Sequence, residues 1–131
     1  MHDVASAAAA VVVLGSVVFQ DCILQDNLQA HGIHVMPTGE LTVTGTTIRR
    51  CSMGLLVMSK AVLGKSCSIT ACAMSGGFAM KHGDGPAEVT VEAGADVVCE
   101  GNSTSSQANK HEYAAYGGTI KGVAEEKVTI L

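Results

Sequence analysis

Apolar and polar residues alternate along short segments of this chain, and these segments recur at a regular interval. Three of them begin at a glycine, in Gly32–Met36, Gly54–Met58 and Gly77–Lys81, with the shared form glycine, apolar, any residue, apolar, variable. The glycines follow one another at steps of 22 and then 23 residues. A period of two in the apolar positions predicts β-strands that bury one face.

Two further strands are expected in each unit, separated by a small or polar bend. They lie in four segments that align with one another, 17–27, 41–52, 62–73 and 89–102. Three short strands per unit of 22 or 23 residues predict that each unit is one turn of a coil. Equivalent strands then stack about 4.8 Å apart as parallel sheets. The predicted inward ladders are Ile33/Leu55/Phe78, Val35/Val57/Met80, Leu41/Val62/Val89, Val43/Gly64/Val91 and Ile23/Ile48/Ile69/Val98.

The strand pattern resembles the repeats of right-handed parallel β-helices. The G-[IL]-x-V-M strand, the apolar second strand and the x-C/T-I-x-x-C/N third strand carry the resemblance over about residues 7–102. This pectate-lyase-like superfamily includes pectate lyases, polygalacturonases, phage tailspikes and repeat domains of certain F-box and cytoskeleton-associated proteins. The resemblance implies an all-β fold, a right-handed parallel β-helix (solenoid) of about four to five short coils. It is specific for architecture and not for activity.

A single β-helix domain is therefore expected over residues 1–131, with coils at about 7–102 and a C-terminal tail or partial coil at 103–131. In the tail we expect a loop at 103–109, a short helical turn at 110–116, and strands at 117–123 and 128–131. The apolar stretch 7–19 is shorter than the roughly 20 residues that span a bilayer. It also lacks the basic leader of a signal peptide, so it predicts a buried strand pair.

The composition is consistent with a narrow aliphatic core, and it bears on which classes of partner the chain can bind. The 131 residues are 47% apolar, 15% charged and 3% aromatic, with a net charge of −4. Basic residues are not clustered, which excludes a nucleic-acid-binding face. The five cysteines are odd in number and lack metal-ligand spacing, so we expect buried thiols, with disulfides as the alternative. Thiols, and the missing leader, favour an intracellular location.

The residues that would carry catalysis or bind a metal do not come together in this pattern. Asp21 and Asp96 occupy equivalent positions on coils roughly 14 Å apart, farther than the about 5–9.5 Å of paired glycosidase carboxylates. Lys81–Pro86 is interpreted as a turn, and His31 and His34 should face opposite sides of a strand. The threonines at 42–47 do not recur on neighbouring coils, as an ice-binding array would require. We predict no catalytic residue, no metal and no cofactor.

The outer face of the first sheet is the predicted binding surface. Its expected outward residues on neighbouring coils are His34, Met36, Leu56, Met58 and Ala79. A large exposed apolar patch is typical of a contact surface, and methionine suits an adaptable one. The alternative is that the tail, 113–131, folds back over this sheet.

The function expected from these features is that of a non-catalytic structural or protein-interaction module. It would bind a protein partner or another copy, by coil-end stacking or through the outer sheet, as part of a larger assembly. The alternative, which the family resemblance implies, is a carbohydrate-binding or polysaccharide-degrading β-helix protein. No membrane span is expected.

Overall fold

The computed structural model describes residues 9–27, 31–51, 53–70, 72, 75–83, 85–95, 97–100 and 112–130. Within these ranges the chain forms fifteen β-strands and one short 3₁₀ helix. The first two coils contain β1 (Ala9–Val13), β2 (Ser16–Gln20), β3 (Ile23–Asn27), β4 (His31–Val35), β5 (Glu40–Thr44) and β6 (Thr47–Cys51). The next two contain β7 (Met53–Val57), β8 (Lys60–Leu63), β9 (Ser68–Thr70), β10 (Ser75–Met80), β11 (Glu88–Val91) and β12 (Val98–Glu100). The chain continues through β13 (Tyr113–Tyr116), β14 (Thr119–Lys121), η1 (Glu125–Lys127) and β15 (Val128–Ile130).

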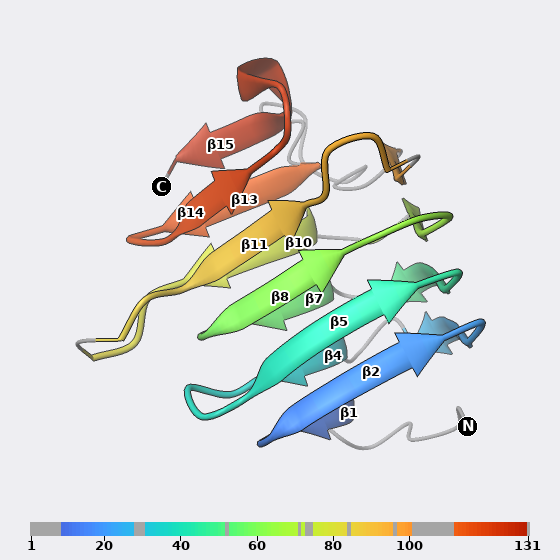
Figure 1. The fold of residues 1–131 in the computed structure, drawn as a ribbon, viewed down its shortest axis with the longest axis horizontal. Coiled ribbons are helices and arrows are strands. Elements are labelled where there is room, and N and C mark those ends of the chain that lie inside the picture. The colour runs from blue at the N-terminus through green and yellow to red at the C-terminus, as the bar shows by residue number, and fades with distance from the viewer. Residues whose placement is uncertain are drawn as a thin grey trace.

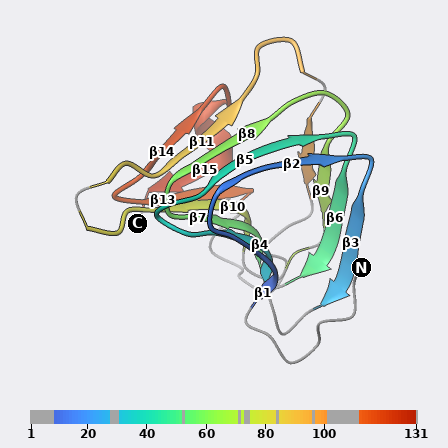
Figure 2. The same cartoon turned by 60° about the horizontal axis from the view of Figure 1, so that its bottom comes forward.

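The strands form three sheets in which every neighbouring pair is parallel. Sheet A has the order β1-β4-β7-β10-β13-β15, sheet B has β14-β11-β8-β5-β2, and sheet C has β12-β9-β6-β3. Successive coils rise from the N-terminal to the C-terminal end in a right-handed sense (Figure 1). The three sheets surround a common core (Figure 2). The predicted right-handed parallel β-helix is confirmed.

The core consists of aliphatic ladders that run along the coil axis. In sheet A, Ile33 pairs with Leu55, and Val35 pairs with Val57; all four side chains are completely buried. In sheet C the row continues from Leu24 to Ile48 and Ile69. Stacking like side chains at the inter-strand spacing buries them efficiently without needing large aromatic groups.

A row of glycines marks the corner where each coil enters sheet A. Gly32, Gly54 and Gly76 occupy equivalent positions, one residue before the paired residues of sheet A. A Cβ atom on Gly54 would lie 2.5 Å from Cγ2 of Ile69 and 2.6 Å from the carbonyl oxygen of Gly76. One on Gly32 would lie 2.5 Å from the carbonyl oxygen of Gly54. Real Cβ atoms do not approach so closely, so this corner requires glycine.

The register of β10 corrects the sequence prediction by one residue. Gly77 pairs with Leu55, and Ala79 pairs with Val57, so these two residues face inward. Phe78 and Met80, predicted to be inward, face outward. The sequence offers two adjacent glycines at this corner, and the first one, not the second, continues the glycine row. Because side chains alternate along a strand, a slip of one residue exchanges the two faces.

The predicted ladders of sheets B and C are also shifted. Ala61 and Leu63, not Val62 and Gly64, are inward on β8. In the ladder of sheet C, Leu24 takes the position predicted for Ile23, whose side chain is 61% exposed. At the other end of this ladder, Ile69 pairs with Cys99 and not with Val98. The physical reason in sheet B is turn length: four residues separate β4 from β5, but only two separate β7 from β8. A constant repeat therefore misplaces the strand that follows the shorter turn.

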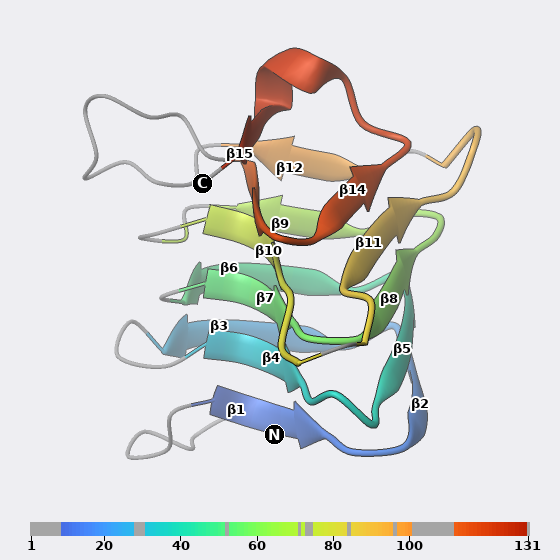
Figure 3. The ribbon, with the colours of Figure 1, turned by 90° about the vertical axis from the view of Figure 1, so that its left-hand side faces the viewer.

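The C-terminal segment extends the coil. β13 and β14 begin a fifth coil, and η1 then crosses the end of the stack to reach β15, the sixth strand of sheet A (Figure 3). The two predicted strands are β14 and β15, but the predicted helical turn is wrong where it is described, because Tyr113–Tyr116 is β13. The tail thus enlarges sheet A instead of folding over its outer face. The predicted loop at 103–109 lies outside the described residues.

The glycine row generates a stability prediction. We expect Gly54→Ala to destabilise the fold by about 1–3 kcal/mol, because the added methyl group overpacks the corner against Ile69 and the backbone of Gly76. Gly15→Ala is the matched control, since a Cβ there meets nothing within 4 Å. Urea unfolding of the two variants measures the difference. Equal stability of both variants would show that the glycine row is not sterically required.

Candidate functional site

The outer face of sheet A presents two apolar ladders that cross five coils. The residues whose side chains point away from the core form a first ladder, Val12, His34, Leu56, Phe78 and Ala114, which follows directly from strand pairing. The second ladder lies two residues further along the chain. In it Met80 pairs with Tyr116, and Leu14, Met36 and Met58 directly follow the ends of β1, β4 and β7. We call these ten residues the apolar face.

Alternation along the strands sets the direction of these side chains. On β4, Ile33 and Val35 are completely buried in the core, so His34 lies on the opposite surface. The N–H of Met36 donates to the carbonyl of Val13 at 3.0 Å, and that of Met58 donates to the carbonyl of Val35 at 2.8 Å. These bonds continue the sheet register to the end of the second ladder. The methionines are therefore stacked at the ordinary spacing between strands.

Exposure differs between the residues of the apolar face, and Ala114 in the first ladder is only 3% exposed. Leu56 lies between His34 and Phe78 along the first ladder and is only 6% exposed, although it is not part of the core cluster. At the ends, Leu14 is 63% exposed and Tyr116 is 58% exposed. The outward side chains thus form a second apolar layer, in which Val12, Leu14 and Tyr116 are exposed and the other residues are half-buried or buried.

Four of the five predicted binding residues lie on this face: His34, Met36, Leu56 and Met58. The fifth, Ala79, does not, because its side chain is fully buried in the core opposite Val57. Phe78 and Met80 take its place, as the register of β10 requires. The sequence prediction also missed the face's two ends, on β1 and β13. The signals that could have found them are the apolar pairs Val12/Leu14 and Ala114/Tyr116, which repeat the spacing of His34/Met36.

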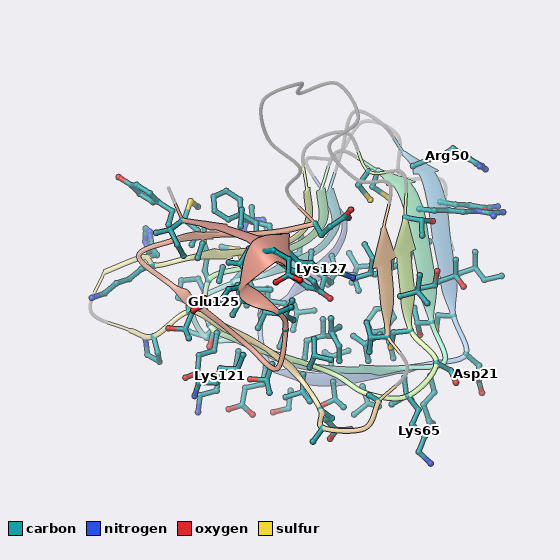
Figure 4. The ribbon with its side chains drawn as sticks, turned by 90° about the horizontal axis from the view of Figure 1, so that it is seen from above. Asp21, Arg50, Lys65, Lys121, Glu125 and Lys127 are labelled. Atoms are coloured by element: carbon teal, nitrogen blue, oxygen red, sulfur yellow. The ribbon has the colours of Figure 1, made fainter. Side chains whose placement is uncertain are left out.

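Charged groups lie mainly on the other two sheets. On sheet B, Glu40, Lys60 and Glu88 form one in-register row with alternating charge, and the Lys121 ammonium lies 3.0 Å from the Glu88 carboxylate. On sheet C, the guanidinium of Arg50 pairs with the carboxylate of Asp26 and lowers the pKa of that carboxyl. Figure 4 shows Arg50 and Lys121 pointing outward from these two sheets.

One cation borders the apolar face. Lys81 follows Met80 directly, is exposed, and donates its backbone N–H to the carbonyl of Tyr116 at 3.0 Å. The corresponding positions on the neighbouring coils are Pro37, Ser59 and Gly117, which carry no charge. Lys60 also lies near this corner, but it is flanked by the two glutamates of its row. Among the described residues beside the methionine ladder, Lys81 therefore contributes a positive charge.

The His, Cys, Asp and Glu residues within the described ranges are dispersed over the coil. No group of three or more His, Cys, Asp or Glu within them is placed to hold a metal ion. Asp96 and Asp84 lie outside the described residues, so the wide separation of Asp21 from Asp96 and the Lys81–Pro86 turn as a whole stay predictions. Cys51, Cys67 and Cys72 are buried thiols, as predicted, whereas the thiol of Cys22 is only half-buried. Burial raises the pKa of the Cys72 thiol and so disfavours its reactive thiolate.

A second candidate site is an apolar pocket of about 320 Å³ at the C-terminal end of the coil. It lies between β14, η1 and β15, and its lining includes Ile120, Val123, Val128 and Ile130. The pocket forms where the fifth coil passes from β14 to β15 without a strand in sheet C. In Figure 4, Glu125 and Lys127 mark η1 across this end.

No helix in the described part of the chain is long and apolar enough to cross a membrane.

His34 gives the apolar face a pH dependence. Burial lowers the pKa of its imidazole from the ordinary value of about 6.5. The unfolded chain therefore takes up this proton at a higher pH than the folded chain, and stability is lost as the pH falls through 6.5 towards the folded pKa. We expect the wild-type protein to lose more stability than His34→Leu between pH 7.5 and pH 5.5 in urea unfolding. An equal loss of stability in both proteins would contradict the lowered pKa of His34. Titration of the His34 imidazole by NMR measures this pKa directly.

Comparison with known proteins places this chain in no family. No family profile, no curated protein and no solved structure matches it significantly. The assignment to the parallel β-helix architecture rests on the strand order and pairing themselves.

Proposed function

We propose that this chain is a non-catalytic structural and protein-interaction module that binds a protein partner through the apolar face. One observation carries this proposal: ten in-register outward positions on five coils include only two with polar atoms in the side chain, His34 and Tyr116. Soluble proteins rarely expose continuous apolar surface of this extent without using it. The outer faces of sheets B and C are more mixed, since Val18, Ile23 and Val98 are exposed there among polar and charged residues.

The residue types of the apolar face favour a role in binding a partner over a role in stabilising the fold. Fully burying an exposed methionine or leucine side chain contributes about 1.5–3 kcal/mol, so burying the remaining exposed part of the half-buried methionines contributes a fraction of that value each. A few residues of this kind supply most of an affinity. Three stacked methionines, Met36, Met58 and Met80, add an adaptable surface that adjusts to its partner. The core does not need these side chains, because sheet A already buries its inward ladders.

Site-specific photocrosslinking tests this proposal. A photoreactive residue at position 58, at the centre of the apolar face, should form adducts with a protein in extracts of the source cells. The same residue at position 42, an exposed outward position of sheet B, should not. Adducts at both positions, or at neither, would contradict a protein-binding role for the apolar face.

A carbohydrate-binding function is the second candidate. It follows from the resemblance to the pectate-lyase-like superfamily, to which we propose the chain is related. Phe78 and Tyr116 favour it, because both aromatic rings lie on the apolar face of adjacent strands. Under this alternative a panel of acidic and neutral oligosaccharides should show saturable binding by calorimetry, reduced at least tenfold by Tyr116→Ala. Absence of heat with every oligosaccharide would leave only the protein partner.

A further inference from the structure

The dimensions of the apolar face limit what can cover it. Its five strands span about 19 Å along the coil axis, at about 4.8 Å per strand. Across this direction its two ladders are about 7 Å apart, at about 3.3 Å per residue. The face is therefore a stripe roughly 25 Å long and 12 Å wide once side chains are included. Its long direction runs along the axis of the coil.

A second copy is a poor match for this stripe. Two such faces packed together would bury roughly 600–900 Å² in total, below the about 1,200 Å² at the lower end of stable interfaces, so the stripe does not support a stable dimer. A helix on the same stripe would bury a comparable area, which corresponds to a weak, transient complex. An extended peptide is no better. The backbone N–H and C=O groups of β4, β7, β10 and β13 are already committed to neighbouring strands, so the face offers side chains but no free sheet edge.

An α-helix matches the stripe in width, length and repeat. A helix with its side chains is about 10–12 Å wide, and 16 residues extend about 24 Å. Its pitch of about 5.4 Å is close to the about 4.8 Å between coils, so each helical turn meets about one coil. Apolar residues at i, i+3 or i+4, i+7 and i+11 would contact successive rungs of the methionine ladder.

The rim adds a charge preference. Lys81 is exposed beside the methionine ladder at the fourth coil, and the equivalent positions on neighbouring coils are uncharged. A partner helix that carries a carboxylate on this flank would complement Lys81. A rim charge of this kind contributes more to orientation than to affinity.

We propose that the apolar face is the docking site of an amphipathic α-helix of about 16 residues, laid along the coil axis with an acidic residue facing Lys81. This inference rests on the proposed protein-binding function and names its partner class. The helix belongs to another protein, and the apolar face recognises the helix by contact with its row of apolar side chains.

A designed peptide provides the probe. It has 18 residues, leucines at positions 3, 7, 10 and 14, glutamates on one flank and glutamine elsewhere, and a fluorescent label. We expect fluorescence anisotropy to show micromolar binding to the full chain, at least tenfold tighter than binding of a peptide with the same composition and its leucines spread around the helix. Met58→Lys should weaken binding at least tenfold, whereas Thr42→Lys on sheet B should leave it unchanged. Equal binding of both peptides would overturn the proposal.

A charge exchange tests the orientation, and circular dichroism checks that each variant is folded. Lys81→Glu should weaken binding of the glutamate peptide several-fold and strengthen binding of a peptide with lysines on the same flank. If Met58→Lys does not fold, Met36→Lys replaces it. Light scattering that shows a dimer disrupted by either substitution would assign the face to a second copy and overturn the proposal. Crosslinks at position 58 without any helix binding would refute the helix alone and leave the protein-binding function intact.

Discussion

The close approach of backbone to backbone at one corner of the coil fixes the rest of the structure. At Gly32 and Gly54 the chain leaves sheet C and enters sheet A with no space for a Cβ atom between it and the next coil, and Gly76 occupies the equivalent position in the row. This contact determines which residue begins each strand of sheet A. Because side chains alternate from that point, the same contact decides which residues enter the core and which form the outer layer.

The inner and outer layers of sheet A differ in chemistry as a result. Inside, aliphatic ladders fill a narrow core, and Tyr113 packs over the space left by Gly77, where a Cβ would lie 3.0 Å from the Tyr113 ring. Outside, methionine, leucine and phenylalanine form a second apolar layer that the fold itself does not need. Sheets B and C instead direct threonines and paired charges to solvent together with a few exposed apolar residues, Val18, Ile23 and Val98.

The coil could be predicted from sequence because its period is visible in the glycines and the alternating strands. The register could not be predicted throughout, since Gly76 and Gly77 fit the pattern equally well and only the approach to neighbouring carbonyls separates them. The turns after β4, β7 and β10 differ in length, which no constant repeat anticipates. Four face residues were therefore found, while Ala79 was misplaced and Phe78 and Met80 were missed. The ends of the face were missed because β13 follows a long, unrelated segment.

NMR of the methionine methyl groups tests the central claim most directly. This claim is that Met36, Met58 and Met80 stack in register on the outer face of sheet A. With ¹³C-methyl-labelled methionine assigned by single substitutions, the account predicts NOEs between Met36 and Met58 and between Met58 and Met80, but none between Met36 and Met80. It also predicts that a soluble paramagnetic agent broadens all three methyl signals. A Met80 methyl that is protected from the agent and shows NOEs to the buried Val57 would place it in the core, and would contradict both the register and the apolar face.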